Sequence, residues 1–361
     1  MRKAYVPGEV RLPGRGTATN PPNRFERLRY EADVEDAPAI PDAEAPALRT
    51  EFFRDATRKI LATNESPDIP FDVSLNPYRG CEHGCAYCYA RPTHEYLGFS
   101  AGLDFESKIL VKEDAPDRLR TELSRKGWRP QTVALSGVTD PYQPVERRLG
   151  ITRRCLEVFL EFRNPVGLIT KGDLVVRDAD LLAALAGFGA ASVSVSIATL
   201  DETLARALEP RAPTPRARLA AVEALSAAGV PCGVYTAPAV PGLNDHEIPA
   251  ILAVARAAGA RWAGFVPLRL PGAVAELFVD WLDRYAPLRK EKVLGRIRDV
   301  RGGRLNDPDF GSRMRGEGAI AEQIGDLFRV AARRAGLAER APALSAASFR
   351  VPSGPQLLLF P

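Results

Sequence analysis

The strongest constraint on this chain is a loop that carries three cysteines within eight residues, Cys81, Cys85 and Cys88. Thiolates separated by three residues and then by two can converge on one metal centre, because a tight loop carries all three sulfurs to one side. Gly80 and Gly84 supply the backbone freedom that such a loop needs. Three ligands suit an iron–sulfur cube whose fourth iron stays open to an exogenous ligand.

A zinc site is the alternative for the same three cysteines. Together with His83 or His94 they could hold a structural zinc ion in a Cys3His site. Short cysteine motifs also match by chance, so the spacing alone leaves both metal centres open.

The composition is that of an ordinary globular chain. Its 361 residues, 45% of them hydrophobic, suffice for one large α/β domain with terminal extensions. No run of about eighteen apolar residues exists, so we expect no membrane span. The charged residues 1–8 are not followed by the apolar segment of a secretory signal. Five cysteines, three of them clustered, do not indicate a disulfide framework, and free thiols indicate the reducing cytoplasm.

The charge of the chain is unevenly distributed, although the formal net charge is only +4. Residues 1–30 carry seven basic and two acidic side chains, whereas residues 31–48 carry six acidic and no basic ones. Residues 289–315 carry nine basic against four acidic side chains. Such runs are usually solvated faces, and contact with nucleic-acid phosphates is the alternative.

Strands and helices alternate along the middle of the chain. The predicted strands cover residues 71–75, 132–136, 166–170, 192–197, 232–236 and 262–266. The predicted helices cover residues 152–162, 178–186, 215–228, 245–258 and 274–285. Repeated βα units with apolar strands predict a parallel sheet covered by helices. Periodicity alone does not distinguish a partial barrel from a doubly wound sheet.

Polar side chains follow these strands at their carboxyl ends, where parallel βα barrels carry their chemistry. The polar residues are Ser136, Thr139 and Asp140 after the second strand, Thr170 and Lys171 after the third, Ser196 at the end of the fourth, Asn244 and Asp245 after the fifth, and Arg269 after the sixth. A zinc module has no use for polar strand ends gathered on one rim, which favours the iron–sulfur interpretation.

The cysteine loop and its flanks resemble the signature of the radical S-adenosylmethionine (SAM) superfamily. The likeness is carried by Ser74–Gly80, by the Cys-x3-Cys-x2-Cys motif with Tyr87 before its last cysteine, and by Ala90–His94. These residues are similar to the spore photoproduct lyase-like branch, in an uncharacterised bacterial group, and the likeness runs from about Gly14 to about Leu337.

The resemblance implies an α/β fold with a partial (βα)6 TIM-like barrel, open on one side. It divides the chain into an N-terminal extension (1–65), partly extended with one short helix, a core barrel (66–286) and a basic helical C-terminal extension (287–361).

The resemblance also implies cofactors and the residues that hold them. Cys81, Cys85 and Cys88 would bind one 4Fe–4S cluster. SAM would complete the coordination of the open iron and would be cleaved there to a 5′-deoxyadenosyl radical. Flavodoxin or ferredoxin is the kind of electron donor implied. The residues expected at the cofactor are Tyr87 beside the cluster, Ser136 and Gly137 with Thr139 and Asp140 at the ammonium, Lys171 or Arg211 at the carboxylate, and Ser196 at the ribose. The superfamily's commoner turn is Gly-Gly-Glu, so the carboxylate that meets the ammonium stays open.

The two remaining cysteines limit the chemistry. Cys155 is expected in the helix after the second strand and Cys232 at the start of the fifth. Two isolated thiols cannot hold a second cube, which disfavours enzymes with auxiliary clusters. Spore photoproduct lyase returns hydrogen through a cysteine near its substrate. Cys232 is the only remote candidate for that role, and a small buried cysteine is its simpler interpretation.

The two extensions carry weaker patterns. Residues 1–48, rich in Pro, Gly and charge, predict an extended arm. Residues 50–63 have a helical pattern with Phe52, Phe53, Ala56, Ile60 and Leu61 on one side. A basic helix over 288–301, a loop over 309–316 that could close the open barrel side, and an amphipathic helix over 318–335 follow the core.

The last residues resemble the peptide that docks on the bacterial sliding clamp, with Gln356, Leu357, Leu359 and Phe360 at the contact positions. The alternative is a hydrophobic end that packs back onto the barrel. With the basic stretches, this tail favours a substrate related to nucleic acid. An enzyme that acts on a small molecule or a protein, and a zinc-stabilised nucleic-acid-binding module, are the other hypotheses.

Overall fold

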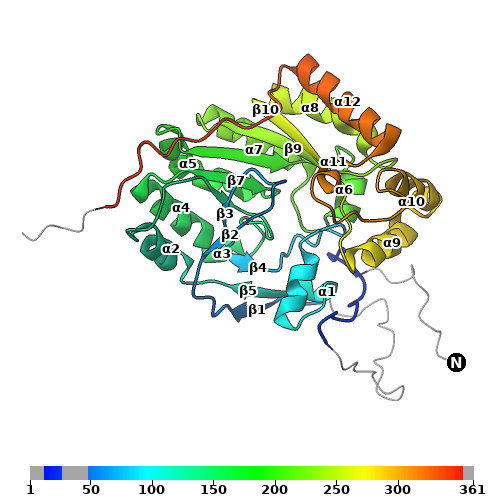
Figure 1. Ribbon diagram of the computed structural model, residues 1–361, viewed down its shortest axis with the longest axis horizontal. Coiled ribbons are helices and arrows are strands. Elements are labelled where there is room, and N and C mark those ends of the chain that lie inside the picture. The colour runs from blue at the N-terminus through cyan, green and yellow to red at the C-terminus, as the bar shows by residue number, and fades with distance from the viewer. Residues whose placement is uncertain (1–11, 27–47, 353–361) are drawn as a thin grey trace, which may run out of the picture.

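A seven-stranded sheet in the order β10-β9-β8-β7-β6-β3-β2 lies at the centre of the molecule (Figure 1). The computed structural model describes residues 12–26 and 48–352. The strands of this sheet are β2 (Leu61–Thr63), β3 (Val73–Leu75), β6 (Val133–Leu135), β7 (Val166–Thr170), β8 (Ala191–Ser196), β9 (Cys232–Ala239) and β10 (Trp262–Pro267). From β3 to β10 all neighbours are parallel, and β2 runs antiparallel to β3. The six predicted strands are confirmed, and the sheet does not close, as expected of a partial barrel.

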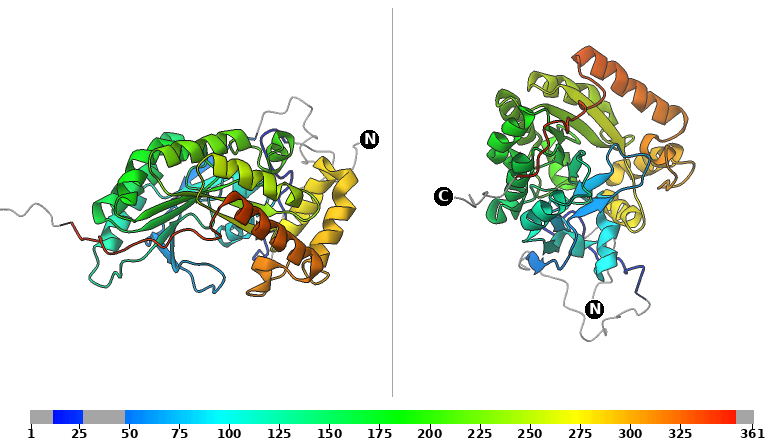
Figure 2. Two further views of the ribbon diagram at one scale, coloured as in Figure 1. Left: turned by 90° about the horizontal axis from the view of Figure 1, so that it is seen from above. Right: turned by 60° about the vertical axis from the view of Figure 1, so that its left-hand side comes forward.

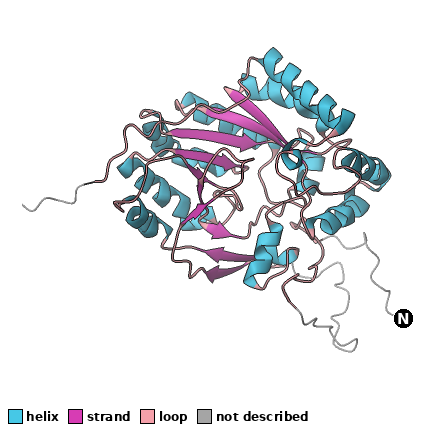
Figure 3. Ribbon diagram, viewed as in Figure 1, coloured by secondary structure: helices cyan, strands magenta, loops and turns pink. Residues whose placement is uncertain are grey.

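Helices surround the strands on the outside of the sheet (Figure 3). The α-helices are α1 (Leu103–Ser107), α2 (Ala115–Leu123), α3 (Glu146–Leu149), α4 (Ile151–Phe162), α5 (Ala179–Ala186), α6 (Glu202–Leu208), α7 (Pro215–Ala227), α8 (Ile248–Ala257), α9 (Val274–Tyr285), α10 (Lys290–Asp299), α11 (Ser312–Arg315) and α12 (Gly318–Ala335). Short 3-10 helices are η1 (Arg91–Leu97), η2 (Asp173–Asp178), η3 (Asp245–Glu247) and η4 (Pro287–Arg289).

Helical periodicity explains why these segments pack as they do. In α4, Ile151, Cys155, Val158 and Phe162 recur every three or four residues, and all four are buried. Thr214 begins α7 by accepting a hydrogen bond from the amide of Ala217, directly before a proline at the first helical position. Among the helices of the described ranges, none combines the length and apolar character needed to cross a membrane.

The predicted helix over residues 50–63 is wrong. This segment forms β1 (Glu51–Arg54) and then β2. β1 pairs in parallel with β5 (Lys108–Val111), which also pairs with β4 (Tyr78–Arg79). β5, the partner of β1, lies far away in the sequence, and its pairing with β1 overrides a local pattern that fits a helix equally well.

The segment over residues 309–316 lies across the open side of the barrel, as expected. Asp68, in the loop between β2 and β3, accepts hydrogen bonds from the Gly311 amide (2.7 Å) and from Arg313 Nε (2.6 Å). On the other side, Arg301 connects this segment to the end of β10, since it donates to the Arg313 carbonyl through Nη1 (2.8 Å) and to the Leu268 carbonyl through Nη2 (2.6 Å). One short segment therefore connects the two edges of the sheet.

The C-terminal segment after α12 runs along the ends where the strands begin (Figure 2). Ala338 pairs with Trp262 at the start of β10, and the Ser345 amide donates to the Gly189 carbonyl just before β8. The Arg350 amide donates to the Phe162 carbonyl at the end of α4. The described chain thus ends on the face opposite the carboxyl ends of the strands. The clamp-like residues 356–360 lie outside the described residues.

A candidate metal and cofactor site

The cysteine loop follows β4 and is held by its own turns. The amides of Gly84 and Cys88 donate to the carbonyls of Cys81 and Cys85, and the Cys81 amide donates to the Phe105 carbonyl at 2.9 Å. Gly84 adopts a φ of +67°, which a glycine takes without strain. Cys81 and Cys85 are buried, and Cys88 is half-buried.

The environment of the thiols favours binding of a positive centre. Burial, followed by the charges of Asp140 and of the other two cysteines, raises the pKa of Cys81 well above its usual value. Burial also raises the pKa of Cys85 to about 12, although the Lys171 ammonium opposes this. Thiols that raise one another's pKa lie near each other, and a bound cation would favour their thiolate forms.

A buried ion pair between Arg91 and Glu106 holds the backbone of the cysteine loop. Arg91, which is 0% exposed, donates to the Cys85 carbonyl through both Nε (3.0 Å) and Nη2 (2.8 Å). The same guanidinium donates to Glu106 Oε1 at 3.0 Å and to the Gly102 carbonyl at 2.8 Å. The first helical segments after the loop thereby fix the position of the loop backbone.

Residues 14–17, which we call the N-terminal clasp, cover the other side of the loop. Glu106 accepts hydrogen bonds from the amides of Gly16 (3.0 Å) and Thr17 (3.1 Å) and from the Thr17 hydroxyl (2.6 Å). Arg15 Nη1 donates to the Glu106 carbonyl at 2.6 Å. Sequence reasoning missed this contribution, because no local pattern connects Gly16 to a glutamate ninety residues later.

A buried polar cluster stands beside the loop on the barrel side. The Tyr87 hydroxyl donates to one carboxylate oxygen of Glu209, and Arg218 donates to the other. Arg218 also donates to the Ser196 carbonyl at 2.9 Å, and the Lys171 ammonium lies 5.8 Å from the centre of the Tyr87 ring. Burial raises the pKa of Glu209, but Arg218 and Lys171 outweigh it and hold that pKa below the ordinary value.

Two of the predicted cofactor residues, Tyr87 and Lys171, therefore lie beside Glu209, a carboxylate that was not predicted as a site residue, and Ser196 is connected to it by its backbone carbonyl through Arg218. Glu209 directly follows α6. Its proximity to Tyr87 depends on two segments more than a hundred residues apart. A buried glutamate with two nearby cations is a signal that only the folded chain provides.

The turn after β6 is held by Asp140. Its carboxylate accepts hydrogen bonds from the Thr170 hydroxyl (2.6 Å), the Lys171 amide (2.7 Å) and the Tyr142 amide (2.9 Å). His83 Nδ1 lies 3.4 Å from the same carboxylate. Burial alone raises the pKa of Asp140, but His83, Lys171 and Thr170 bring it to about 2. Asp140 thus connects the cysteine loop to the ends of β6 and β7, and its contact with a cofactor ammonium stays a prediction.

The other predicted residues of this turn lie nearby. Ser136 and Gly137 have φ angles of +151° and +123°. The Ser136 hydroxyl donates to the Thr139 carbonyl at 3.2 Å, and the Thr139 amide donates to Asn76 Oδ1 at 3.2 Å. The Gly137 carbonyl accepts a hydrogen bond from Tyr89, the residue after Cys88.

Arg211 does not join the Lys171 cluster. Its Nη2 lies 3.0 Å from Glu82 Oε1 in the cysteine loop, and its Nη1 donates to the Thr50 hydroxyl at 3.0 Å. The two cations predicted for the cofactor carboxylate are thus separated, and Lys171 is the one beside Tyr87.

The zinc alternative requires His83 or His94 as fourth ligand. His83 Nδ1 faces the Asp140 carboxylate at 3.4 Å. His94 Nε2 lies 2.9 Å from the Lys108 carbonyl, and its ring packs beside Phe99 and Phe105. No group of three or more Cys, His, Asp and Glu side chains within residues 12–26 and 48–352 is arranged to hold a single metal ion. Cys155 and Cys232 are fully buried in α4 and β9, as expected for packing residues.

Comparison with known proteins identifies the family. A family model described as the radical SAM superfamily matches residues 75–255, which include the cysteine loop and the strands through β9. The chain belongs to the radical SAM superfamily. Its radical SAM region covers half of the chain, and the chain is therefore an enzyme of the radical SAM class.

Relatives of this radical SAM chain occur in bacteria and archaea. The uncharacterized Mycobacterium tuberculosis protein Rv2578c is 39% identical over 260 residues, covering 70% of this chain and 75% of the relative. The uncharacterized Methanocaldococcus jannaschii protein MJ0683 is 31% identical over 199 residues, covering 55% of this chain and 71% of the relative.

Solved structures support the fold of this radical SAM chain. A mutant of spore photoproduct lyase matches with a TM-score of 0.58 and 16% identity, over 80% of this chain and 81% of that one. Spore photoproduct lyase complexed with dinucleoside spore photoproduct matches with a TM-score of 0.57 and 15% identity, over 80% and 81%. These likenesses confirm the expected partial barrel of the spore photoproduct lyase type.

Proposed function

We propose that this enzyme binds one 4Fe–4S cluster through Cys81, Cys85 and Cys88 and cleaves SAM reductively. The proposal is carried by three thiols on one glycine-containing loop that lies inside the radical SAM region. When bound, cluster and cofactor together supply a 5′-deoxyadenosyl radical that takes a hydrogen atom from the substrate. We place the enzyme in the cytoplasm, where free thiols and an oxygen-sensitive cluster persist.

The chain's own residues bind and orient the cofactor in this proposal. Lys171 is the cation for the cofactor carboxylate, since its ammonium stands at the barrel side of the loop next to Tyr87. Glu209 and Arg218 hold the Tyr87 hydroxyl and thereby fix the ring against the loop. Ser136, Gly137, Thr139 and Asp140 bind the ammonium side, and Ser196 binds the ribose. Arg211 contacts the cysteine loop through Glu82 and is the second candidate for binding the cofactor carboxylate.

Anaerobic purification tests this function. The protein should be brown, should contain about four irons per chain, and should release 5′-deoxyadenosine when reduced in the presence of SAM. Cys85→Ala should lose iron and cleavage together, whereas Cys232→Ala, which changes a buried cysteine in β9, should keep both. Colourless protein with one zinc per chain, or SAM cleavage by the Cys85→Ala variant, would contradict the ligand assignment.

A substrate related to nucleic acid is part of the proposal. It is supported by the basic stretch at residues 289–315 and by the fold shared with spore photoproduct lyase, which is complexed with a dinucleoside in one solved structure. A small molecule or a protein is the other substrate class. If single-stranded DNA accelerates 5′-deoxyadenosine release, the nucleic-acid proposal is supported. If only small-molecule or protein fractions accelerate 5′-deoxyadenosine release, a small molecule or a protein replaces nucleic acid as the proposed substrate.

We propose two protein partners. Flavodoxin or ferredoxin supplies the electron, and the sliding clamp binds Gln356, Leu357, Leu359 and Phe360. A clamp on this tail would leave the cysteine loop uncovered, since the described chain ends beside Phe162 at the opposite ends of the strands. Pull-down with the clamp should succeed for the full chain and fail when residues 356–360 are replaced by a Gly-Ser sequence of equal length. Equal capture of both chains would remove the clamp from the proposal.

A further inference from the structure

Three arginines that we call the rim arginines, Arg269, Arg313 and Arg315, lie on two segments that pack together at the open side of the barrel. Arg269 follows β10, and the other two lie on α11. Arg313 pairs with Asp68 at 2.6 Å. Within residues 12–26 and 48–352, Arg269 and Arg315 have no carboxylate within 4.0 Å.

Arg269 is a partly buried cation whose nearby carboxylates, Asp68 and Asp307, form no ion pair with it within 4.0 Å. Its Nη1 donates to Met314 Sδ (3.6 Å), and its Nε is buried without a hydrogen-bond partner among the described residues. Burial and then the charge of Arg313 lower the pKa of Arg269 below its ordinary value. Desolvating a cation without a partner costs free energy, and a bound anion would offset that cost.

The same guanidinium stands next to the cysteine loop. It lies 5.7 Å from the centre of the ring of Tyr89, which directly follows Cys88 and donates to the Gly137 carbonyl. A group bound at Arg269 would therefore sit at the mouth of the site where the substrate must approach the cofactor.

Arg301 fixes the backbone that carries the rim arginines. It donates to the Leu268 carbonyl (2.6 Å), the Arg313 carbonyl (2.8 Å) and the Ser312 carbonyl (3.3 Å). Asp307, the other nearby carboxylate, accepts from the Asp309 amide at 2.9 Å. The segment is thus ordered before any ligand binds, which reduces the entropic cost of binding.

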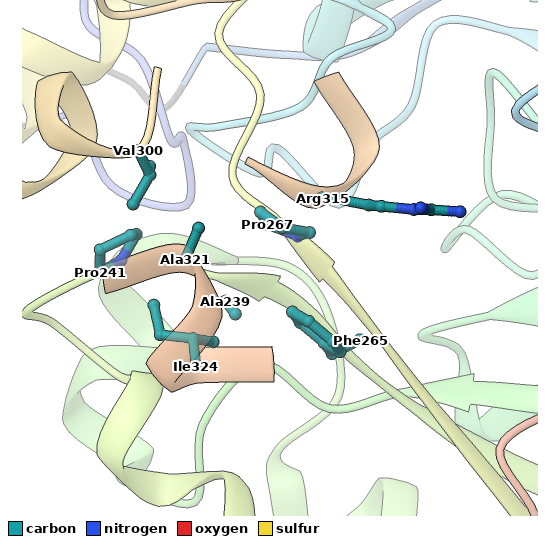
Figure 4. Close-up of a pocket in the computed structure, with 8 residues that line it drawn as sticks. All are labelled: Ala239, Pro241, Phe265, Pro267, Val300, Arg315, Ala321 and Ile324. Atoms are coloured by element: carbon teal, nitrogen blue, oxygen red, sulfur yellow. The ribbon is translucent and has the colours of Figure 1, made fainter. Parts of the chain in front are cut away.

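The crevice between β10 and α12 explains the direction of Arg315. It is lined by Ala239, Pro241, Phe265, Pro267, Val300, Arg315, Ala321 and Ile324 (Figure 4). Arg315 extends past Pro267 and away from the apolar side chains Ala321 and Ile324, so its stem lines the crevice while its charged head lies outside. The crevice itself offers the guanidinium no acidic partner.

Phe310 adds an aromatic surface to the rim arginines. Its side chain is 61% exposed, and the Arg313 guanidinium lies 4.3 Å from the centre of its ring. An exposed aromatic ring beside arginines is the arrangement on which proteins stack an unpaired base while binding its phosphate.

We propose that Arg269 and Arg315, on the same two segments as Arg313 and its neighbour Phe310, bind a phosphate group of the substrate at the open side of the barrel. Arginine favours phosphate because its planar guanidinium donates two parallel hydrogen bonds. That the bound molecule is the substrate rests on the proposed function, whereas phosphate binding itself does not require the cluster. The phosphate could belong to a nucleic-acid strand or to a phosphorylated small molecule.

Fluorescence anisotropy with a labelled single strand of about ten nucleotides tests this site. The Arg269→Gln/Arg315→Gln double variant should bind it about tenfold more weakly or worse. The slope of log affinity against log salt should fall by roughly 0.7 for each arginine removed. The matched control is Arg333→Gln on α12, which should bind as the unchanged protein does. Equal iron content and melting temperature show that the variants are folded.

Competition distinguishes the two sources of phosphate. If a mononucleotide or inorganic phosphate displaces the strand at concentrations near the strand's own, the site serves a phosphorylated small molecule; if only longer strands compete, it serves nucleic acid. Unchanged affinity in the double variant, or an equal loss in Arg333→Gln, overturns the proposal. Arginine-dependent binding by a protein that cleaves no SAM would contradict the proposed function and leave the phosphate site standing.

Discussion

Gly16 lies so close to Gly84 that a Cβ atom on Gly16 would stand 1.7 Å from the Gly84 carbonyl oxygen. No real Cβ atom tolerates such a contact, so the backbone of the N-terminal clasp touches the backbone of the cysteine loop directly. Glu106 reinforces this contact by binding the amides of Gly16 and Thr17 while it pairs with Arg91 below the loop. The N-terminal segment is therefore a wall of the candidate metal site.

Substituting Gly16 with alanine should displace the clasp without unfolding the barrel. We expect the iron–sulfur absorbance of the variant to decay several-fold faster in air, because oxygen and water reach the loop more easily. Proteolysis within residues 12–26 should accelerate as well. The matched control is Gly127→Ala, where an added Cβ meets no atom within 4 Å. Decay as slow as in the unchanged protein would mean that the clasp does not shield the loop.

Replacing Glu106 with glutamine should cost much of the protein's stability. Both partners of the Arg91–Glu106 pair are 0% exposed, and removing one charge leaves the other buried and unpaired. We expect a loss of about 3–5 kcal/mol in the free energy of unfolding, measured by denaturant titration. Asp326→Asn removes an exposed ion pair with Arg329 and should change stability far less. Similar effects of both substitutions would contradict this view of the buried pair.

Tyr87 and Glu209 should be energetically coupled. In a double-mutant cycle of Tyr87→Phe and Glu209→Gln, we expect a coupling of about 1–3 kcal/mol, because the hydroxyl donates to a buried carboxylate. Tyr78→Phe removes a similarly buried hydroxyl, which donates to Glu146 instead, and should be additive with Glu209→Gln. Additive effects of the first pair would show that the hydroxyl and the carboxylate do not act together.

His94 should make stability depend on pH between about 4 and 6.5. Burial lowers the pKa of His94 from 6.5 to about 4, so in this range the unfolded chain binds more protons than the folded one. The contribution of His94 to the free energy of unfolding is therefore fully present above pH 6.5. It is lost as the pH falls toward 4, by about 3 kcal/mol in total. In His94→Gln, which keeps a donor for the Lys108 carbonyl and does not titrate, this part of the loss should disappear. An unchanged pH profile would show that His94 is not the titrating group.

Much of the fold follows from local sequence. Short apolar runs predict β7 and β8 to within one residue, and the three- and four-residue spacing of Ile151, Cys155, Val158 and Phe162 predicts α4. The cysteine motif together with its flanking residues likewise resembles the signature of the family, because all of these residues lie close together along the chain. In each case the residues that form the pattern lie close together along the chain, so the pattern is visible in the sequence.

Other features depend on residues that are neighbours only after folding. Residues 51–54 become a strand because β5 pairs with them, and Glu209 joins Tyr87 across 122 positions. Gly16 meets Gly84 across 68 positions, and Arg313 meets Asp68 across 245. A one-dimensional pattern reports periodicity and local chemistry, but it does not report which distant segments come into contact. The cysteine loop was therefore determined by the sequence itself, whereas the clasp, the buried cluster and the rim arginines around it were decided by tertiary packing.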